Sequence, residues 1–560
     1  MVAQNPDRQV GASDAESIFA AIGGGDAPLG VSLDGLADAV ISSLNAELIA
    51  RESIRLYGEW LKILWGLSDR ELPSKDPRFA DGSWRDNPVY KRLAQAYLAF
   101  CDAVDSFVDH NPDWRKRERA KFLAGIVTSA LAPTNTLIGN PAALKKAFES
   151  GGMSLVRGAR NMVGDILEGE GLPSQVKKSD FEVGVNLAAT PGAVVFRNEM
   201  LELLQYRPTT AAVRQIPTLM ITPPIGKYYF MDLAPKRSFA EHAVGKGIPF
   251  FATSWRNPRH EHAAWGLDDY LQTLIQAVNA VCDITESDRL NVLGLCAGGI
   301  MSTMLLNYLA ATGNDRVNAA SFGVTLLDFG MEAPLGAFQS RPLTGLARRR
   351  SATSGILAAS SLAQVFAWMR PNDLVWNYWV NNYLEGKDPP SFDLLAWSTD
   401  GTNLPGALHG QFLDIFQNNP LIEPGTLTVL GQQMDLKRIK VETLVMAALT
   451  DHLTPWKGCY RTTQLLGGES TFILSNAGHI ASLVNPPGNA KASYFVGPKP
   501  GPDPDAWLQQ AEKRGGTWWE AWSDWTLEHS AGEHAAPVSL GSTQYPVIED
   551  APGTYVRERA

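Results

Sequence analysis

The sequence has few cysteines for its length, and they show no paired spacing. Only Cys101, Cys282, Cys296 and Cys459 occur in 560 residues. There is no CxxC motif and no histidine at zinc-finger spacing, so we expect no structural metal site. A disulfide scaffold would need more cysteines in a regular pattern, so the sequence predicts a protein of a reducing compartment.

Long hydrophobic runs and an excess of basic residues are also missing. No uninterrupted apolar run reaches the roughly 18 residues of a membrane span, and the first residues lack the pattern of a secretory signal. Lysine and arginine number 49 against 59 aspartates and glutamates, which gives a net charge of −10. Nucleic acid binding needs clustered cations, and the densest basic run is only 348–350. We therefore expect a cytoplasmic protein with no membrane span and no nucleic-acid partner.

What is present indicates a large folded chain with an accessory region. Hydrophobic residues make up 45% and charged residues 19%, as in ordinary globular proteins. Residues 1–35 are rich in glycine, alanine and aspartate and predict a flexible leader, whereas 36–185 predict a helical N-terminal domain. One predicted helix face carries an apolar stripe, formed by Leu44, Leu48, Leu56, Trp60, Leu64 and Leu67. We expect this stripe to pack against the rest of the chain; the alternative is an interfacial helix that touches an apolar surface.

From residue 186 to 560 the pattern changes to short β-rich segments that alternate with helical ones. Strands separated by crossover helices imply an α/β fold with a mostly parallel sheet covered on both faces. The alternation stops between about 330 and 425, where aromatic residues are frequent, and this indicates an inserted cap. The predicted strands are 218–222, 249–254, 290–295, 322–327, 443–448 and 471–474.

One segment carries most of the chemical signal. The strand at 290–295 leads into Gly-Leu-Cys-Ala-Gly at 294–298, and a helical run follows. This is the nucleophile-elbow pattern G-x-S-x-G with Cys296 in place of serine. Amides at the start of the helix would stabilise a thiolate, and Ala297 N–H is the natural donor to an oxyanion. The alternative is that Cys296 is a small buried apolar side chain.

A nucleophile of this type needs a base and an orienting acid, which hydrolase-fold proteins supply in the order nucleophile, acid, histidine. The strand at 443–448 leads to Asp451 and His452, and the strand at 471–474 leads to His479. Loops at strand ends carry the site in a doubly wound sheet. Asp451 and His452 compete for one role. We favour Asp451, because a carboxylate best stabilises the imidazolium of His479.

The second oxyanion donor is expected in the loop after the strand at 218–222. Prolines 223 and 224 have no amide proton, so the donor must follow them. The backbone amides of Ile225 and Gly226 are the candidates. No metal and no redox cofactor is needed for this chemistry.

The motifs together resemble those of the polyhydroxyalkanoate synthases, from about residue 90 to the C-terminus. The lipase-like box of that family has a central cysteine, which falls on Cys296, and its catalytic aspartate and histidine fall on Asp451 and His479. The resemblance implies an α/β-hydrolase fold without cofactors. The matching segments are 190–195, 223–229, 254–258, 294–299, 366–374, 376–384, 451–456 and 475–479.

The resemblance implies an acyltransferase that polymerises (R)-3-hydroxyacyl-CoA, with release of CoA, through an acyl thioester on cysteine. The growing polymer and the granule surface are then partners, and we expect a homodimer. Chain length and several segments look most like the class II enzymes, whereas Gly226 replaces a usual asparagine and 325–329 look more like class I. Preference for short or medium acyl chains stays open, with Trp397, Ala477 and Ala481 as candidate channel residues. The alternative function is a cysteine-dependent thioesterase or depolymerase of the same fold.

Overall fold

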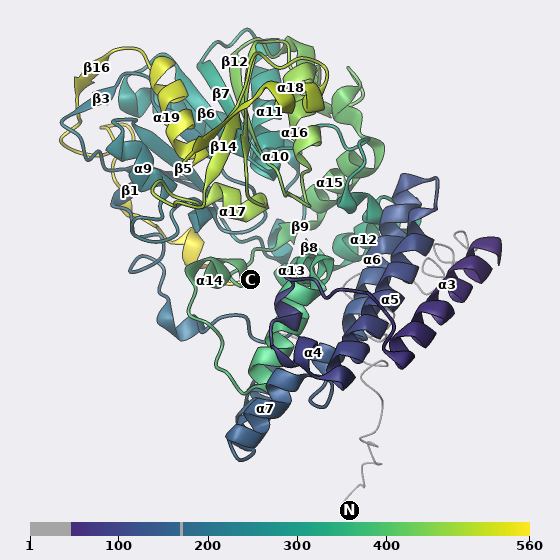
Figure 1. Ribbon diagram of the computed structural model, residues 1–560. Coiled ribbons are helices and arrows are strands. Elements are labelled where there is room, and N and C mark those ends of the chain that lie inside the picture. Colours follow the sequence, from purple (N-terminus) through teal and green to yellow (C-terminus); the bar gives the residue numbers. More distant parts are fainter. Residues whose placement is uncertain (1–45, 169–171) are drawn as a thin grey trace, which may run out of the picture. The chain divides into compact units, whose positions relative to one another are not determined.

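The computed structural model describes residues 46–168 and 172–560. The predicted leader and Leu44 lie outside these ranges. The chain forms two compact units (Figure 1). One contains the described residues 46–168 and 172–174 together with 336–347 and 360–389, and the other contains 175–335, 348–359 and 390–560. The aromatic-rich stretch at about 330–425 therefore contributes residues to both units.

The first unit is helical, and its helices begin at well-defined caps. Side chains of Asn87, Asp113 and Asn140 accept hydrogen bonds from the first backbone amides of three helices. Phe79 and Trp84 form the centre of a small aromatic core. The N-terminal helices are α3 (Ala46–Trp65), α4 (Ser83–Asp86), α5 (Pro88–Asp109), α6 (Trp114–Ala130), α7 (Pro141–Glu149) and α8 (Met153–Glu168).

Residues 336–347 and 360–389, later in the chain, add further helical segments to the first unit. In the π-helical segments η7 (Asn372–Trp376) and η8 (Trp379–Leu384), neighbouring aromatic rings make edge-to-face contacts. The aromatic residues of this stretch thus pack among themselves. The helices that precede them are α12 (Arg341–Ser354) and α13 (Ala359–Met369).

The apolar stripe of α3 is not buried as expected. Leu48 is buried, but Trp60, Leu64 and Leu67 are 45%, 64% and 71% exposed. Helix α3 packs against α5, and that contact leaves the opposite side of α3 uncovered. The expectation of packing is therefore wrong for most of the stripe, and the alternative of an interfacial helix remains.

The second unit is built on an 11-stranded sheet, with the order β15-β14-β13-β12-β7-β6-β4-β5-β2-β1-β17. Its central strands are parallel, which confirms the predicted α/β fold. These strands are β4 (Thr218–Ile221), β5 (Phe250–Trp255), β6 (Leu290–Leu295), β7 (Val317–Gly323), β12 (Glu442–Ala448) and β13 (Ser470–Ser475).

Antiparallel strands extend the sheet at both edges, and the sequence patterns did not predict them. They are β1 (Gly192–Arg197), β2 (Leu201–Tyr206) and β17 (Glu549–Asp550) at one edge, and β14 (Ser493–Val496) and β15 (Glu512–Gly515) at the other. Three short ribbons stand apart from the sheet: β3 (Ala212–Arg214) with β16 (Glu533–Ala535), β8 (Ile356–Leu357) with β9 (Leu404–Pro405), and β10 (Thr428–Val429) with β11 (Gln432–Gln433).

Helices cover both faces of the sheet (Figure 1). Helices α9 and α19 pack together, and three tryptophans of α19 are buried against the core; α10 and α11 form a second pair. No described helix has the length and apolar character that a membrane crossing requires. The helices of this unit are α9 (Phe239–Gly245), α10 (Leu267–Thr285), α11 (Ala297–Ala311), α14 (Asp393–Ser398), α15 (Gly406–Asn418), α16 (Trp456–Leu465), α17 (His479–Leu483), α18 (Pro504–Gln510) and α19 (Trp518–Glu528).

One predicted strand was misplaced. The strand expected at 322–327 is β7, which begins at Val317 and ends at Gly323. Val324 has φ +44°, which a strand does not allow. Val324, Leu326 and Leu327 are apolar because the loop after β7 is buried, not because they continue the strand.

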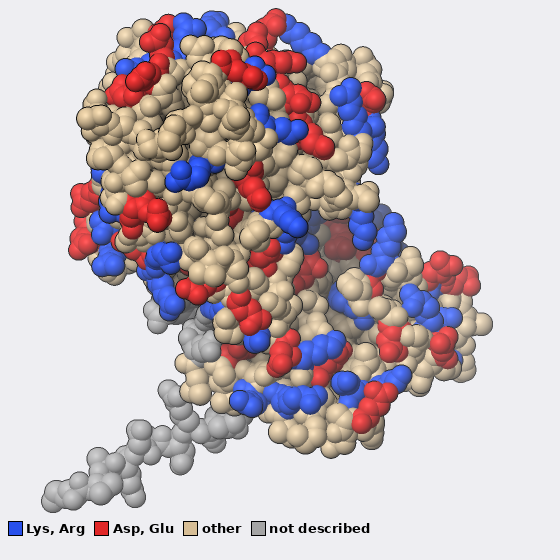
Figure 2. Space-filling model, turned by 90° about the vertical axis from the view of Figure 1, so that its left-hand side faces the viewer, with Lys and Arg blue, Asp and Glu red and all other residues tan. Residues whose placement is uncertain are grey.

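Charges of both signs mix on the surface. Figure 2 shows lysine and arginine interspersed with aspartate and glutamate on one face of the molecule. A nucleic-acid site would need basic side chains gathered together, so this face gives no support for one.

Candidate active site

Strand β6 ends in a sharp turn that carries Cys296. This residue has φ 50° and ψ −121°, and α11 begins at the next residue. A side chain at positive φ is strained, so the surrounding structure must hold it. Hydrogen bonds from Cys296 N to Gly323 O (2.9 Å) and from Gly299 N to Cys296 O (2.9 Å) do so. The turn therefore has the form of a nucleophile elbow, with a half-buried thiol at its tip.

The two glycines of the motif allow close backbone contacts around this turn. A Cβ atom on Gly294 would lie 2.8 Å from Gly299 Cα, and one on Gly298 would lie 2.7 Å from the carbonyl carbon of Thr222. Strands β4 and β6 are neighbours, with Ile221 opposite Gly294. The loop that follows β4 therefore starts beside the first turn of α11.

Asp451 and His479 follow β12 and β13, which are adjacent parallel strands. Both residues are buried, and His479 Nδ1 lies 2.6 Å from Asp451 Oδ2. Asp451 also accepts hydrogen bonds from the backbone amides of Leu453 and Thr454 and from the Thr454 hydroxyl, at 2.8–2.9 Å. Burial alone would raise the pKa of Asp451, but His479 and the two Thr454 donors lower it below its usual range. The structure thus brings Asp451, which the sequence analysis favoured over His452, to His479 Nδ1.

Cys296 is close enough to His479 to influence its charge. Burial alone would lower the pKa of His479, because a buried cation loses its hydration. The negative charge of a Cys296 thiolate, its hydrogen bond to the ring and the Asp451 carboxylate instead raise this pKa to about 10. The arrangement therefore suits a thiolate–imidazolium pair with a carboxylate behind it.

The two candidate oxyanion donors in the loop after β4, the amides of Ile225 and Gly226, differ in their hydrogen bonding. Gly226 N donates to the Thr402 hydroxyl at 2.8 Å, and that hydroxyl donates to Pro224 O at 3.1 Å. The Gly226 amide is therefore engaged. The Ile225 amide makes no hydrogen bond to a described residue, and Ala297 N stands at the start of α11, where amides have no intrahelical partner.

The relatives of the chain decide its family. Residues 75–243 match the family described as the poly-beta-hydroxybutyrate polymerase (PhaC) N-terminus, and 226–486 match the alpha/beta hydrolase fold. Poly(3-hydroxyalkanoate) polymerase 2 of Ectopseudomonas oleovorans is 44% identical over 91% of each chain. The chain belongs to the poly(3-hydroxyalkanoate) polymerase family. The polymerase subunit PhaC of Cupriavidus necator is 40% identical over 90% of this chain and 86% of its own.

Membership of the poly(3-hydroxyalkanoate) polymerase family confirms two predictions. The resemblance to polyhydroxyalkanoate synthases is confirmed, and with it the classification of the chain as an acyltransferase. The α/β-hydrolase fold is confirmed by the family match and by the sheet itself.

The candidate channel residues of this family member lie in different settings. Trp397 Nε1 donates to Lys227 O at 2.7 Å, and its ring would lie 3.1 Å from a Cβ atom on Gly226. The ring also packs on the core cluster that Cys296 contacts. Ala477 is half-buried in the loop before His479, and Ala481 is exposed on α17. Trp397 is thus fixed against the candidate oxyanion loop.

Sequence reasoning missed three polar residues that support the site: Thr454, Thr402 and Lys227. Thr454 could have been found, because it stands three residues after Asp451, the spacing at which side chains bond to a local turn. Thr402 had no such signal, since 176 residues separate it from its partner Gly226.

Proposed function

We propose that the chain polymerises (R)-3-hydroxyacyl groups from CoA thioesters through an acyl thioester on Cys296. The observation that carries this proposal is the Cys296 elbow beside the His479–Asp451 pair, in a chain of this family. Transfer of a thioester onto a thiol gives another thioester, so the acyl group stays activated for the next step. A serine would give a more stable oxoester instead.

Each half-reaction uses the same three side chains. The thiolate of Cys296 attacks the substrate carbonyl, and the amides of Ala297 and Ile225 donate to the oxyanion. The carbon–sulfur bond to CoA then breaks, and CoA leaves with the proton that His479 had taken from Cys296. In the second half, His479 takes the proton of a 3-hydroxyl group, whose oxygen attacks the acyl-cysteine. An oxoester forms, the bond to Cys296 breaks, and the thiolate–imidazolium pair returns.

A saturated acyl-CoA without the 3-hydroxyl tests this scheme, because it can acylate Cys296 but cannot extend. We expect a burst of at most about one CoA per active site, with a matching mass adduct on Cys296. Water-poor surroundings should preserve this adduct, since hydrolysis would otherwise end every chain early. Released CoA and the mass of the intact protein are measured over time.

The same experiment separates a polymerase from a thioesterase or depolymerase. A hydrolase would release CoA from the saturated substrate continuously, because water is its acceptor. Such steady turnover would contradict the proposal. Adding (R)-3-hydroxyacyl-CoA after the burst should slowly restart CoA release, since the blocking acyl group can then pass to a hydroxyl.

We also propose that the uncovered side of α3 holds the enzyme on its polymer product. Ile54, Tyr57, Leu61 and Leu64 recur at helical spacing and are 40–74% exposed. An aliphatic polyester presents an apolar surface, which such a helix face can enter while its charged side stays in water. This occupant is the product of the proposed reaction, so the enzyme would stay beside the chain that it extends.

Replacing Tyr57, Leu61 and Leu64 together by serine should weaken binding to purified polymer granules by at least about tenfold. Turnover of soluble substrate should stay within about twofold of the wild type, because α3 carries none of the proposed site residues. Granule co-sedimentation measures the bound fraction. The matched control replaces Arg55 and Lys62 by serine and should bind normally. Equal binding by the triple variant would refute the role of α3.

A further inference from the structure

The loop that carries Ile225 and Gly226 continues into a buried lysine. The Lys227 side chain is 3% exposed, and its Nζ donates to Val556 O at 2.6 Å and to Glu558 O at 2.7 Å. It also pairs with Asp400 Oδ1 at 3.0 Å. An ammonium group has three donors, and a buried one is stable only when they are bonded. Lys227 therefore ties this loop to two segments that are distant in sequence.

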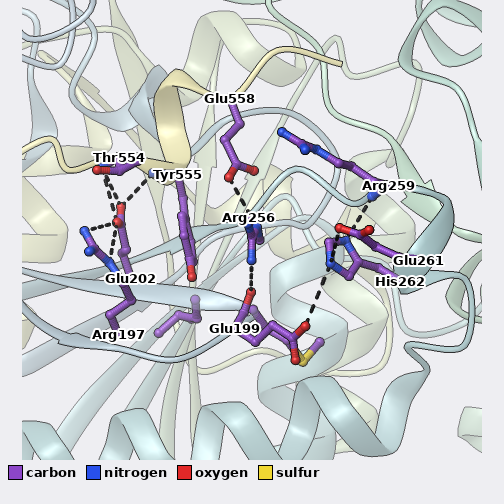
Figure 3. A network of polar contacts seen from close by, with 12 residues as sticks. Arg197, Glu199, Glu202, Arg256, Arg259, Glu261, His262, Thr554, Tyr555 and Glu558 are labelled. Atoms are coloured by element: carbon purple, nitrogen blue, oxygen red, sulfur yellow. Dashed lines mark hydrogen bonds and ion pairs between the residues drawn. The ribbon is translucent and has the colours of Figure 1, made fainter.

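The segment at 549–558 is itself fixed to the sheet, as Figure 3 shows. The buried Glu202 of β2 accepts hydrogen bonds from Thr554 N and Tyr555 N and from Arg197 Nε. Arg256, just after β5, pairs with Glu558 at 3.2 Å and lies over the Tyr555 ring. Strand β17 completes the attachment by pairing with β1. The carbonyl groups that hold Lys227 thus stand on a segment that is bonded to the large sheet.

The other partner of Lys227 is held by the same loop. Tyr229 OH donates to Asp400 Oδ2 at 2.9 Å, and Trp397 donates to Lys227 O. Thr402 binds Gly226 N and Pro224 O. Pro224, Gly226 and Lys227 on either side of Ile225 are therefore anchored, whereas the Ile225 amide itself makes no hydrogen bond to a described residue.

We propose that Lys227 is a positioning residue, which with residues 549–558 holds the Ile225 amide toward the oxyanion of the acylation step. This inference rests on the proposed function, in which Ile225 is an oxyanion donor. Such a donor acts only within about 2.7–3.1 Å of the oxyanion. Without the ammonium, two carbonyl groups and the Asp400 carboxylate lose their shared donor, and the loop shifts away from Cys296.

Single-turnover acylation by a saturated acyl-CoA tests this role in the full-length protein. Lys227→Met should lower the maximal acylation rate by about 10-fold to 10²-fold, less than the loss expected for removing an oxyanion donor outright. The half-saturating substrate concentration should change by less than about twofold. Alkylation of Cys296 by iodoacetamide should keep its rate, because attack at a saturated carbon forms no oxyanion. Lys227→Arg, which keeps the cation, should restore most of the acylation rate.

A pair of deletions tests the acceptors of Lys227 instead of the lysine itself. These deletions replace the first test if Lys227→Met does not fold. Removing 555–560 takes away both carbonyl acceptors and should reproduce the acylation defect; removing only 559–560 keeps them and should be neutral. A wild-type acylation rate in Lys227→Met, or an equal loss of acylation and alkylation, would overturn the positioning role. A wild-type protein that forms no Cys296 adduct would instead refute the proposed function.

Discussion

Replacing Cys296 by alanine is expected to reduce CoA release by at least about 10⁴-fold, because the nucleophile is lost. The fold should survive this change. Alanine keeps the Cβ atom, so the strain at φ 50° is the same in both proteins. The hydrogen bonds that hold the turn use only backbone atoms of residue 296. CoA release with (R)-3-hydroxyacyl-CoA and thermal unfolding are the two measurements.

Cysteine reactivity provides an independent check of this assignment. Burial raises the pKa of the thiols of Cys101, Cys282 and Cys459, to about 11 for Cys282, so these remain protonated at neutral pH. Iodoacetamide should therefore modify Cys296 first. Cys282→Ala is the matched control, since it removes a buried thiol from α10, and it should retain full activity. An active Cys296→Ala variant, or another cysteine modified first, would disprove the role of Cys296.

His479→Gln and Asp451→Asn are expected to impair different steps. Without the imidazole, acylation of Cys296 should slow by about 10²–10⁴-fold, the usual loss for a positioned acid–base group. Asp451→Asn should still form the acyl-enzyme, because a thiol is easily ionised, but it should elongate slowly. An alcohol is a far weaker acid, so its deprotonation depends more on the carboxylate behind His479. Burst and steady-state CoA release resolve the two steps.

The pH dependence of Cys296 alkylation tests the ion pair directly. The thiolate and Asp451 raise the pKa of His479 to about 10, so the imidazolium persists throughout the neutral range. We expect the wild type to be alkylated readily at neutral pH, because the neighbouring imidazolium favours the thiolate. In His479→Gln, which lacks this cation, the alkylation rate at neutral pH should fall, and the difference between the two proteins should shrink as the pH rises toward 10, where the ring of His479 loses its proton. His452→Gln is the matched control and should behave as the wild type. For the preceding experiment, equal impairment of acylation and elongation in both His479→Gln and Asp451→Asn would contradict the division of roles between these two residues.

The candidate site could be predicted because its signals are local. Cys296 follows an apolar strand directly, and Asp451 and His479 lie in the loops just after two others; the parallel order of β6, β7, β12 and β13 places these loops at one edge. The pattern of apolar residues predicted the central strands correctly for the same reason, since it is also a local signal. It failed at 324–327, where a buried loop has the composition of a strand.

Features that depend on distant partners could not be predicted. The apolar stripe of α3 has the pattern of a packed helix, but the number of neighbours that cover a helix is not encoded in its own periodicity. Thr402 and Lys227 gain their importance from residues more than 150 positions away. The homodimer and the granule association stay predictions, and the preference for short or medium acyl chains stays open.

The place of 549–558 in the sheet affects how this protein is made. These residues leave the ribosome after all ten other strands of the large sheet, yet they supply the edge strand that covers β1. During synthesis β1 is therefore an open edge, and open edges favour aggregation. The nascent chain also lacks the acceptors of Lys227 until that moment. If Lys227 positions the site, a nascent chain that still lacks 549–558 should acylate Cys296 about 10-fold to 10²-fold more slowly than the finished protein.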